Sequence, residues 1–387
     1  MLHPGARSEG FRYQRHRLGQ GLHAGRVGLC AGSLYGGGAK PKPVELSPNA
    51  ALIGVRQAWS LKIGAVNFPL DVKVNGERIT LASSDGTLVG LESTGGREIW
   101  RAKVSEPLAA GVGSDGKTAA VVTRSNMLIA LRDGKELWRQ RIPAQVYTAP
   151  LVAGERVFVL SADRSVSAFD GATGRKLWVQ QRPGDALVLR EAGVIRAVGD
   201  TLIVGLSGRM VGLNPLNGSV RWEVPIATAR GANDVERLID LVGSVSREGA
   251  VVCARAFQVA VGCVDAAKGT LVWSTPSNGV VGVHGNERSV FGVEADGKIL
   301  AWSRVNGDRQ WVSERLKYRA MTAPLAVGRS VAVGDDIGLI HLLSVEDGSP
   351  LNRLTTDGSA IAATPVLAGD TLVAVTRNGG VFGFRPE

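Results

Sequence analysis

A motif that ends in tryptophan recurs along the whole chain and restricts the folds that the chain can adopt. One copy is DRSVSAFDGATGRKLW, at residues 163–178. Alternating β-branched and aromatic residues predict a strand over residues 165–169, and the Asp and Gly residues that follow predict a tight turn before a second strand. The closing tryptophan occurs at Trp59, Trp100, Trp138, Trp178, Trp222, Trp273 and Trp311, and Leu351 takes its place in a degraded copy.

The spacing of these positions indicates the architecture. The separations are 41, 38, 40, 44, 51, 38 and 40 residues, and a period near 40 with about four short strands is typical of β-propeller blades. The inner hairpin of the motif occurs eight times; the last copy, residues 378–384, has no outer strand after it, whereas Trp59 has no hairpin before it. We therefore predict an all-β, eight-bladed β-propeller of four-stranded blades, with the ring closed by the N-terminal strand in the last blade. Closure removes free sheet edges, and we expect the tryptophans to pack between blades.

The first 50 residues differ in composition from the rest. They are rich in Gly, Arg, His and Pro and show no sustained alternation, which predicts a disordered segment and linker before a propeller over residues 51–387. No apolar run of 7–15 residues follows the basic start, as a secretory signal would require. No stretch of the chain approaches the ~20 apolar residues that span a bilayer.

The net charge of +10 is concentrated outside the predicted propeller. Residues 1–43 contain seven Lys or Arg and one Glu, so more than half of the excess lies in this segment. Nucleic-acid binding would favour a basic face with exposed aromatic residues on the folded part. We interpret the segment as a solvated basic tail and expect no nucleic-acid partner.

Two consecutive repeats are longer than the others, with intervals of 44 and 51 residues. The additional residues fall within 181–197 and 225–245, and insertions in repeat proteins map to loops on one face, often the binding face. Leu187 and Leu189 would share one face of an extended segment, and Arg190 is a residue type enriched at interface hot spots. The alternative is that both leucines enter blade packing.

Residues capable of catalysis or metal binding are few. Cys253 and Cys263 occupy core positions on the two strands of one hairpin, where they are either small apolar residues or a cross-strand disulfide, which would need an oxidising compartment. His284 and His341 lack the spacing of metal ligands. No nucleophile elbow, P-loop or dinucleotide-binding motif is present. We expect no catalytic residue, no metal and no cofactor.

The text AFDGATGRKLW, at residues 168–178, resembles the repeat of the pyrroloquinoline-quinone-binding propeller enzymes. The resemblance implies the fold and a role for the repeat Gly and Trp in locking blades together. Those enzymes also carry an adjacent Cys–Cys pair and a calcium held by carboxylates, and this chain has no adjacent Cys pair. A quinoprotein-like dehydrogenase is therefore an alternative function.

The propeller is more similar to the BamB family, lipoprotein subunits of the machine that folds β-barrel proteins into the outer membrane. The text VGDDIGLIHLLSVEDG, at residues 333–348, matches that family. Its Leu-x-Leu-Arg element matches Leu187, Leu189 and Arg190, and its second acidic element retains Asp240 but has Val242 in place of the last acid. The resemblance implies a non-enzymatic scaffold that binds the POTRA domains of BamA through these four residues, with unfolded outer-membrane proteins as further partners. A generic propeller adaptor is the other alternative.

The resemblance also implies a lipid anchor at the periplasmic face of the outer membrane. Members of the family begin with a lipoprotein signal and a lipidated Cys, whereas CAGSLYGGGAKPKP, which begins at Cys30, has only the linker. Our hypothesis is that residues 1–30 come from a wrong start or reading frame. If the sequence is literal, Cys30 is the candidate for lipidation, and membrane contact would be through that anchor alone.

Overall fold

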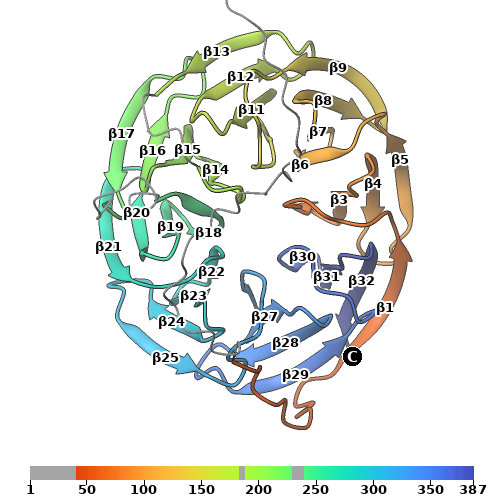
Figure 1. Ribbon diagram of the computed structural model, residues 1–387, viewed down its shortest axis with the longest axis vertical. Coiled ribbons are helices and arrows are strands. Elements are labelled where there is room, and N and C mark those ends of the chain that lie inside the picture. Colours follow the sequence, from red (N-terminus) through yellow and green to blue (C-terminus); the bar gives the residue numbers. More distant parts are fainter. Residues whose placement is uncertain (1–40, 183–187, 229–238) are drawn as a thin grey trace, which may run out of the picture. The chain divides into compact units, whose positions relative to one another are not determined.

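The computed structural model describes residues 41–182, 188–228 and 239–387. Its strands form eight antiparallel sheets, each of four strands, arranged in a ring around a central axis (Figure 1). The described residues contain 32 strands and no helix. The predicted all-β, eight-bladed propeller is confirmed.

Each blade runs from an innermost strand near the axis to an outermost strand at the rim. Blades 1 to 4 consist of β2 (Lys73–Asn75), β3 (Arg78–Ala82), β4 (Thr87–Glu92), β5 (Glu98–Lys103); β6 (Leu108–Ser114), β7 (Thr118–Thr123), β8 (Met127–Arg132), β9 (Lys135–Arg141); β10 (Leu151–Ala153), β11 (Arg156–Leu160), β12 (Val166–Asp170), β13 (Lys176–Gln180); and β14 (Ile195–Val198), β15 (Thr201–Leu206), β16 (Arg209–Leu213), β17 (Val220–Pro225).

The second half of the ring repeats the pattern. Blades 5 to 8 consist of β18 (Leu241–Glu248), β19 (Val251–Ala256), β20 (Ala260–Asp265), β21 (Thr270–Pro276); β22 (Val283–Gly285), β23 (Ser289–Val293), β24 (Ile299–Ser303), β25 (Arg309–Ser313); β26 (Leu325–Val327), β27 (Ser330–Gly334), β28 (Leu339–Ser344), β29 (Pro350–Thr355); and β30 (Val366–Ala368), β31 (Thr371–Val375), β32 (Gly380–Pro386) and β1 (Val55–Lys62).

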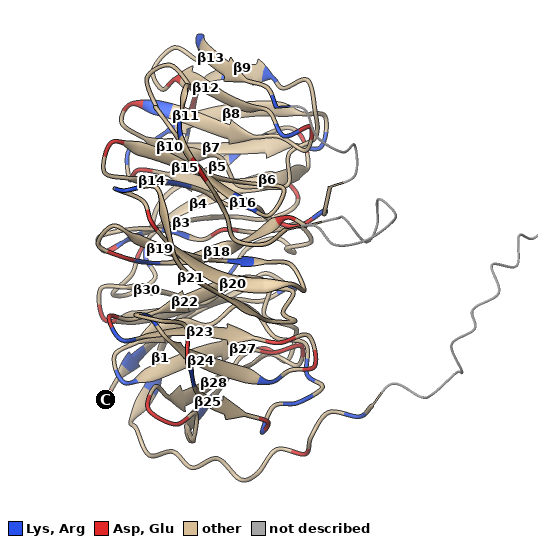
Figure 2. Cartoon of the chain, turned by 90° about the vertical axis from the view of Figure 1, so that its left-hand side faces the viewer, with Lys and Arg blue, Asp and Glu red and all other residues tan. Residues whose placement is uncertain are grey.

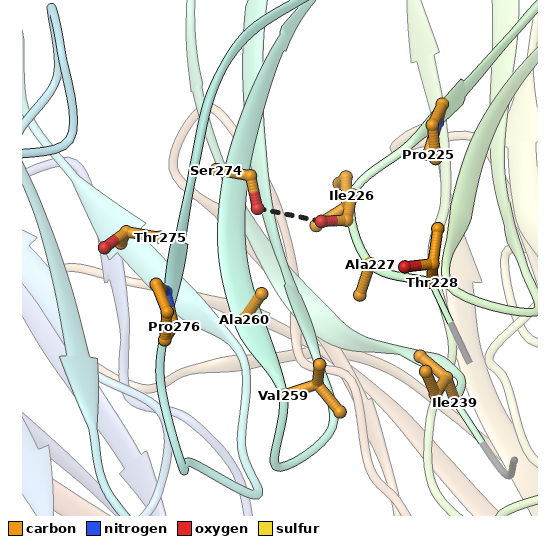
Figure 3. Close-up of a pocket in the computed structure, with 10 residues that line it drawn as sticks. All are labelled: Pro225, Ile226, Ala227, Thr228, Ile239, Val259, Ala260, Ser274, Thr275 and Pro276. Atoms are coloured by element: carbon orange, nitrogen blue, oxygen red, sulfur yellow. Dashed lines mark hydrogen bonds between the residues drawn. The ribbon is translucent and has the colours of Figure 1, made fainter. Parts of the chain in front are cut away.

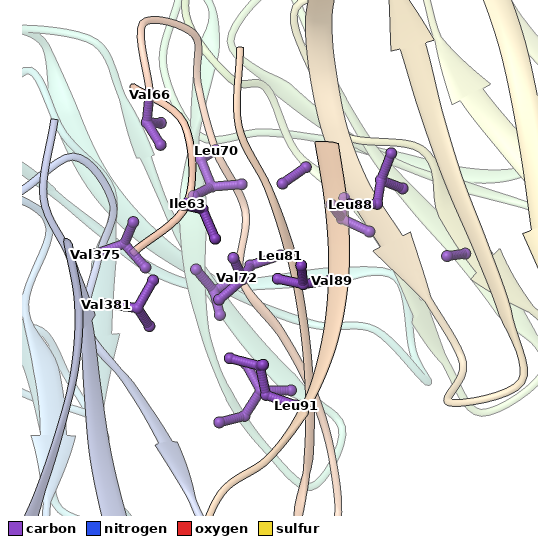
Figure 4. Packing of buried hydrophobic residues seen from close by; sticks show 14 of the residues in the cluster. Ile63, Val66, Leu70, Val72, Leu81, Leu88, Val89, Leu91, Val375 and Val381 are labelled. Atoms are coloured by element: carbon purple, nitrogen blue, oxygen red, sulfur yellow. The ribbon is translucent and has the colours of Figure 1, made fainter. Parts of the chain in front are cut away.

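The first strand of the chain closes the ring. β1 pairs antiparallel with β32, from Val55 opposite Pro386 to Lys62 opposite Gly380, and so forms the outermost strand of blade 8. Side chains of blades 1 and 8 then share one hydrophobic cluster, in which Leu81 and Leu91 lie with Val375 and Val381 (Figure 4). The N-terminal strand therefore makes the closure that the incomplete first and last repeats predict.

The tryptophans contact the blade that follows their own. The Nε1–H group of Trp138 donates to the carbonyl of Gly171 at 2.9 Å, and a Cβ atom on Gly174 would lie 2.5 Å from the Trp138 ring. Only glycine fits beneath such a ring, and Gly174 also has a φ of +72°, which favours glycine. The same donation to the next blade joins Trp59 to Ser93, Trp178 to Pro215, Trp273 to Arg304 and Trp311 to Val345. Trp100 and Trp222 lie against Gly134 and Gly269 of the next blade.

Two kinds of connection share one face of the ring. One is the loop that leads from the outermost strand of one blade to the innermost strand of the next, here called a crossing loop. The other is the turn between the second and third strands of a blade, and the two are hydrogen-bonded to each other. The N–H group of Ala162 in such a turn donates to the carbonyl of Gln145 in a crossing loop at 2.8 Å. We call this side of the ring the crossing face.

Residues 44–53 run along the outside of blade 7. The N–H group of Val44 donates to the carbonyl of Lys317 in a crossing loop at 3.1 Å, and that of Leu52 donates to Leu351 in β29 at 2.7 Å. Between them, Arg353 donates to the carbonyl of Ser47 at 3.0 Å. The segment passes from the crossing face to the opposite face, along the bottom of the view in Figure 2, and covers the edge of β29.

Candidate partner-binding site

The two long repeats place their additional residues in consecutive crossing loops. Residues 181–194 connect β13 to β14, and residues 226–240 connect β17 to β18. Leu187 lies outside the described residues, as does the segment 229–238. Leu189, Arg190 and Asp240 are described, and both loops belong to the crossing face.

Asp240 joins the two loops. One carboxylate oxygen, Oδ2, accepts a hydrogen bond from the backbone N–H group of Leu189 at 3.1 Å. The other, Oδ1, lies 3.9 Å from Nη2 of Arg164, and 9% of the Arg164 side chain and 20% of the Asp240 side chain are exposed. The carbonyl of Asp240 accepts from the N–H group of Phe257 at 3.0 Å. A single residue thus connects blade 3, the first long loop and blade 5.

Further contacts fix the end of the first loop. The N–H group of Gly193 donates to Oγ1 of Thr148 at 2.9 Å, and the N–H group of Gly243 donates to the carbonyl of Ala192 at 2.8 Å. Gly193 also forms an isolated bridge with Val242. Val242 is 2% exposed and packs in the protein interior, so an apolar residue suits the position where the related acidic element has its last acid.

The exposure of the described loop residues differs along the segment. Leu189 is half-buried and Arg190 is exposed. Leu189 lines a small cavity of about 50 Å³ together with Tyr147 and Leu206. No ion-pair partner of Arg190 is found among residues 41–182, 188–228 and 239–387. Leu189 therefore lies partly within the blade packing, whereas the guanidinium of Arg190 is available at the surface.

The carboxyl group of Glu191, the residue after Arg190, has a shifted pKa. Desolvation raises the pKa of the Glu191 carboxyl above its ordinary value, and the positive charge of Arg377 in blade 8 offsets part of that rise. Burial of the Glu191 carboxyl therefore works against its ionised form, next to the exposed guanidinium of Arg190.

An apolar depression adjoins the second loop. It has a volume of about 420 Å³ and lies between the ends of β17 and β21 (Figure 3). Ile226, Ile239 and Val259 supply apolar walls, and Ser274 donates to the carbonyl of Ile226 at 2.8 Å across it. Ile239, which lines the depression, directly precedes Asp240 in the chain.

The cysteines and histidines singled out by the sequence lie away from these loops. Cys253 and Cys263 are paired across β19 and β20 and form a disulfide. Nδ1 of His284 accepts from the N–H group of Ala326 at 3.1 Å, and Nε2 of His341 lies 3.0 Å from the Asp335 carboxylate. Within the described parts of the chain, no cluster of three or more His, Cys, Asp or Glu side chains is arranged to hold a metal ion. Within the same residues, no helix is long and apolar enough to cross a membrane.

Sequence reasoning overlooked two residues of the site, Arg164 and Thr148. Thr148 begins a Thr-Ala-Pro element that recurs at Thr322, where the hydroxyl oxygen accepts from Gly334 at 3.1 Å. That recurrence could have identified the Thr148 hydroxyl as a hydrogen-bond acceptor, although Gly334 belongs to β27 of the same blade and Gly193 to the next crossing loop. Arg164 is an arginine in a turn position where four other blades have glycine and blade 2 has Asn126, which was a detectable departure from the repeat.

Comparison with known proteins gives consistent relationships. The family model described as outer membrane protein assembly factor BamB matches residues 57–313. The chain is 34% identical to the outer membrane protein assembly factor BamB of Burkholderia pseudomallei over 353 residues, covering 90% of this chain and 93% of the relative. It is 36% identical to that of Bordetella pertussis over 348 residues, covering 89% and 90%.

Solved structures show the same fold. The crystal structure of BamB from Moraxella catarrhalis superposes with a TM-score of 0.78 at 23% identity, covering 86% of this chain and 99% of that one. The quinohemoprotein alcohol dehydrogenase of Comamonas testosteroni gives a TM-score of 0.67 at 14% identity, covering 88% and 78%. A BamB protein and an alcohol dehydrogenase thus share this architecture, so the fold alone does not assign an activity.

Proposed function

The chain belongs to the BamB family of outer membrane protein assembly factors, and we propose that it is a non-enzymatic scaffold subunit of the BAM complex that binds the periplasmic POTRA domains of BamA. The observation that carries this proposal is the junction at Asp240, where the two long crossing loops are joined beside the exposed Arg190. The names of the relatives support the assembly role. The POTRA contact is our extension of it.

The geometry suits protein binding. The first loop is held at Leu189 and Gly193 by hydrogen bonds to side chains of the rigid ring, so little ordering entropy is lost when a partner binds. Arg190 offers a planar guanidinium that can pair with a carboxylate in a bidentate manner. Leu189 and the adjoining depression provide apolar surface. We expect an acidic partner surface with an apolar side chain close by.

Two features support a periplasmic location with an N-terminal lipid anchor. The Cys253–Cys263 disulfide favours an oxidising compartment. Val44 is bonded to the crossing loop between blades 6 and 7, so the chain reaches the propeller at the crossing face. A tether that precedes Val44 would therefore begin on the face that carries the partner-binding loops. Cys30, the candidate for lipidation, lies outside the described residues.

Co-isolation tests the proposed function. The full chain, tagged at its C-terminus and produced in its own organism, should fractionate with the outer membrane and co-purify with BamA in mild detergent. The control is the same chain with Arg190→Glu, which should recover much less BamA at equal abundance. Recovery from the soluble fraction without BamA would contradict the proposal and favour an adaptor of another kind.

A further inference from the structure

One turn of blade 3 departs from a pattern that five other blades share. In six blades the turn between the second and third strands ends in a residue with a positive φ, whose N–H group donates to the carbonyl three residues earlier. These last residues have φ values between +62° and +90°. They are Gly86, Asn126, Arg164, Gly297, Gly338 and Gly379. Glycine adopts this region without steric cost and Asn tolerates it, whereas arginine is disfavoured there.

The side chain of Arg164 indicates why an arginine occupies this strained position. It is 9% exposed and reaches toward Asp240, with Nη2 3.9 Å from Oδ1. A residue held in a disfavoured conformation with a buried charged side chain suggests a functional constraint at that place. Arg164 and Asp240 are 76 positions apart in the chain and belong to blade 3 and the entry of blade 5.

The carboxylate of Asp240 is the link between Arg164 and the first loop. Its second oxygen holds the N–H group of Leu189 at 3.1 Å. Hydrogen bonds to an ionised acceptor are stronger than neutral ones, but a largely buried carboxylate needs a counter-charge. Arg164 supplies that charge near the other carboxylate oxygen, Oδ1. The series Arg164–Asp240–Leu189 therefore connects a turn of the rigid ring to the backbone beside Arg190.

We propose that Arg164 is a positioning residue for the partner-binding loop: it neutralises and orients the Asp240 carboxylate, which in turn fixes Leu189 and aims Arg190. This assignment gives Asp240 an internal role in place of a direct partner contact. The effect on affinity rests on the proposed function, whereas the effect on the loop itself can be measured without a partner.

The test uses Arg164→Gly, which restores the residue that four of the other five blades have. Relief of the positive φ should offset part of the stability that is lost when the Asp240 carboxylate loses its counter-charge, so the chain should remain folded. Amide exchange of Leu189, followed in the full chain by hydrogen-exchange mass spectrometry, should accelerate roughly tenfold, and the Kd for the BamA POTRA domains should rise by a similar factor. Arg164→Lys, which keeps the charge, should recover part of both.

The matched control is Asn126→Gly, the same kind of change in the equivalent turn of blade 2. It should alter neither Leu189 exchange nor affinity. Unchanged Leu189 exchange in Arg164→Gly would overturn the proposal, as would faster exchange with unaltered affinity for the POTRA domains. If Leu189 exchange accelerates but the wild-type chain does not bind those domains, the positioning role stands and the proposed function fails.

Discussion

The seams between blades and the two long crossing loops are stabilised in different ways. At the seams a tryptophan of one blade donates to a carbonyl of the next and covers a glycine there, and this arrangement recurs around the ring. The loops are held instead by polar contacts particular to their place, from Asp240 to Leu189 and from Thr148 to Gly193. Repeated apolar seams give rigidity, whereas departures from the repeat create a surface that a partner can distinguish.

The strongest disruption of the ring should come from a seam tryptophan. Trp138→Ala removes a side chain that is 8% exposed, together with its hydrogen bond to Gly171, and should lower the free energy of unfolding by about 4 kcal/mol. Chemical denaturation measures this loss. Below the melting temperature the affinity for the POTRA domains should not change. A parallel loss of affinity would mean that seams and loops are not independent.

Lowering the pH should have a somewhat smaller effect on the free energy of unfolding, through protonation of His284 on the innermost strand of blade 6. Burial, with the charges of Arg196 and Arg304, lowers the pKa of His284 to about 4. Because this folded-state pKa lies below the unfolded value near 6.5, the neutral imidazole stabilises the fold fully above pH ~6.5. That contribution is lost as the pH falls through 4, and it amounts to about 3 kcal/mol.

His284→Asn isolates the effect of this one group. The Asn side chain can still accept from the N–H group of Ala326, but it does not titrate. Between pH 6.5 and pH 4 the variant should lose less unfolding free energy than the wild type, by about 3 kcal/mol. Parallel pH profiles for the two proteins would show that the imidazole of His284 does not contribute to the acid sensitivity of the ring.

The smallest effect concerns one hydrogen bond of the loop. Thr148→Val leaves the N–H group of Gly193 without its acceptor at 2.9 Å, which should cost about 1 kcal/mol. Thr322→Val removes the hydroxyl at the equivalent position of the Thr-Ala-Pro element in blade 7, where it accepts from Gly334 of the same blade, and is the matched control. Both should lose similar stability by denaturation, but only Thr148→Val should weaken POTRA binding, by a few-fold. Equal affinities would separate the Thr148 contact from the binding site.

The sequence predicts the ring well because its evidence is periodic. The Trp spacing, and an outer strand at Trp59 with no hairpin before it, are enough to infer blades, seams and closure. The pairing of Cys253 with Cys263 stayed open, since a disulfide and two small apolar residues suit the same core positions. The partners of Asp240 could not be predicted either, because Leu189 and Arg164 come from distant segments and only the folded loops bring them together. Val242 stands where the related element has its last acidic residue. Its burial accounts for an apolar residue there, and no local sequence pattern indicates that burial.

Titration of the BamA POTRA domains with the full chain, wild type beside Arg190→Glu, tests the central claim most directly. The wild type should bind, and the charge reversal should raise the Kd about tenfold or more with an unchanged melting temperature, because Arg190 is exposed and forms no ion pair within the described residues. Equal binding by both proteins would move the interface away from the crossing loops. Loss of binding together with an equal loss of thermal stability would contradict the separation between a rigid ring and a partner-binding loop.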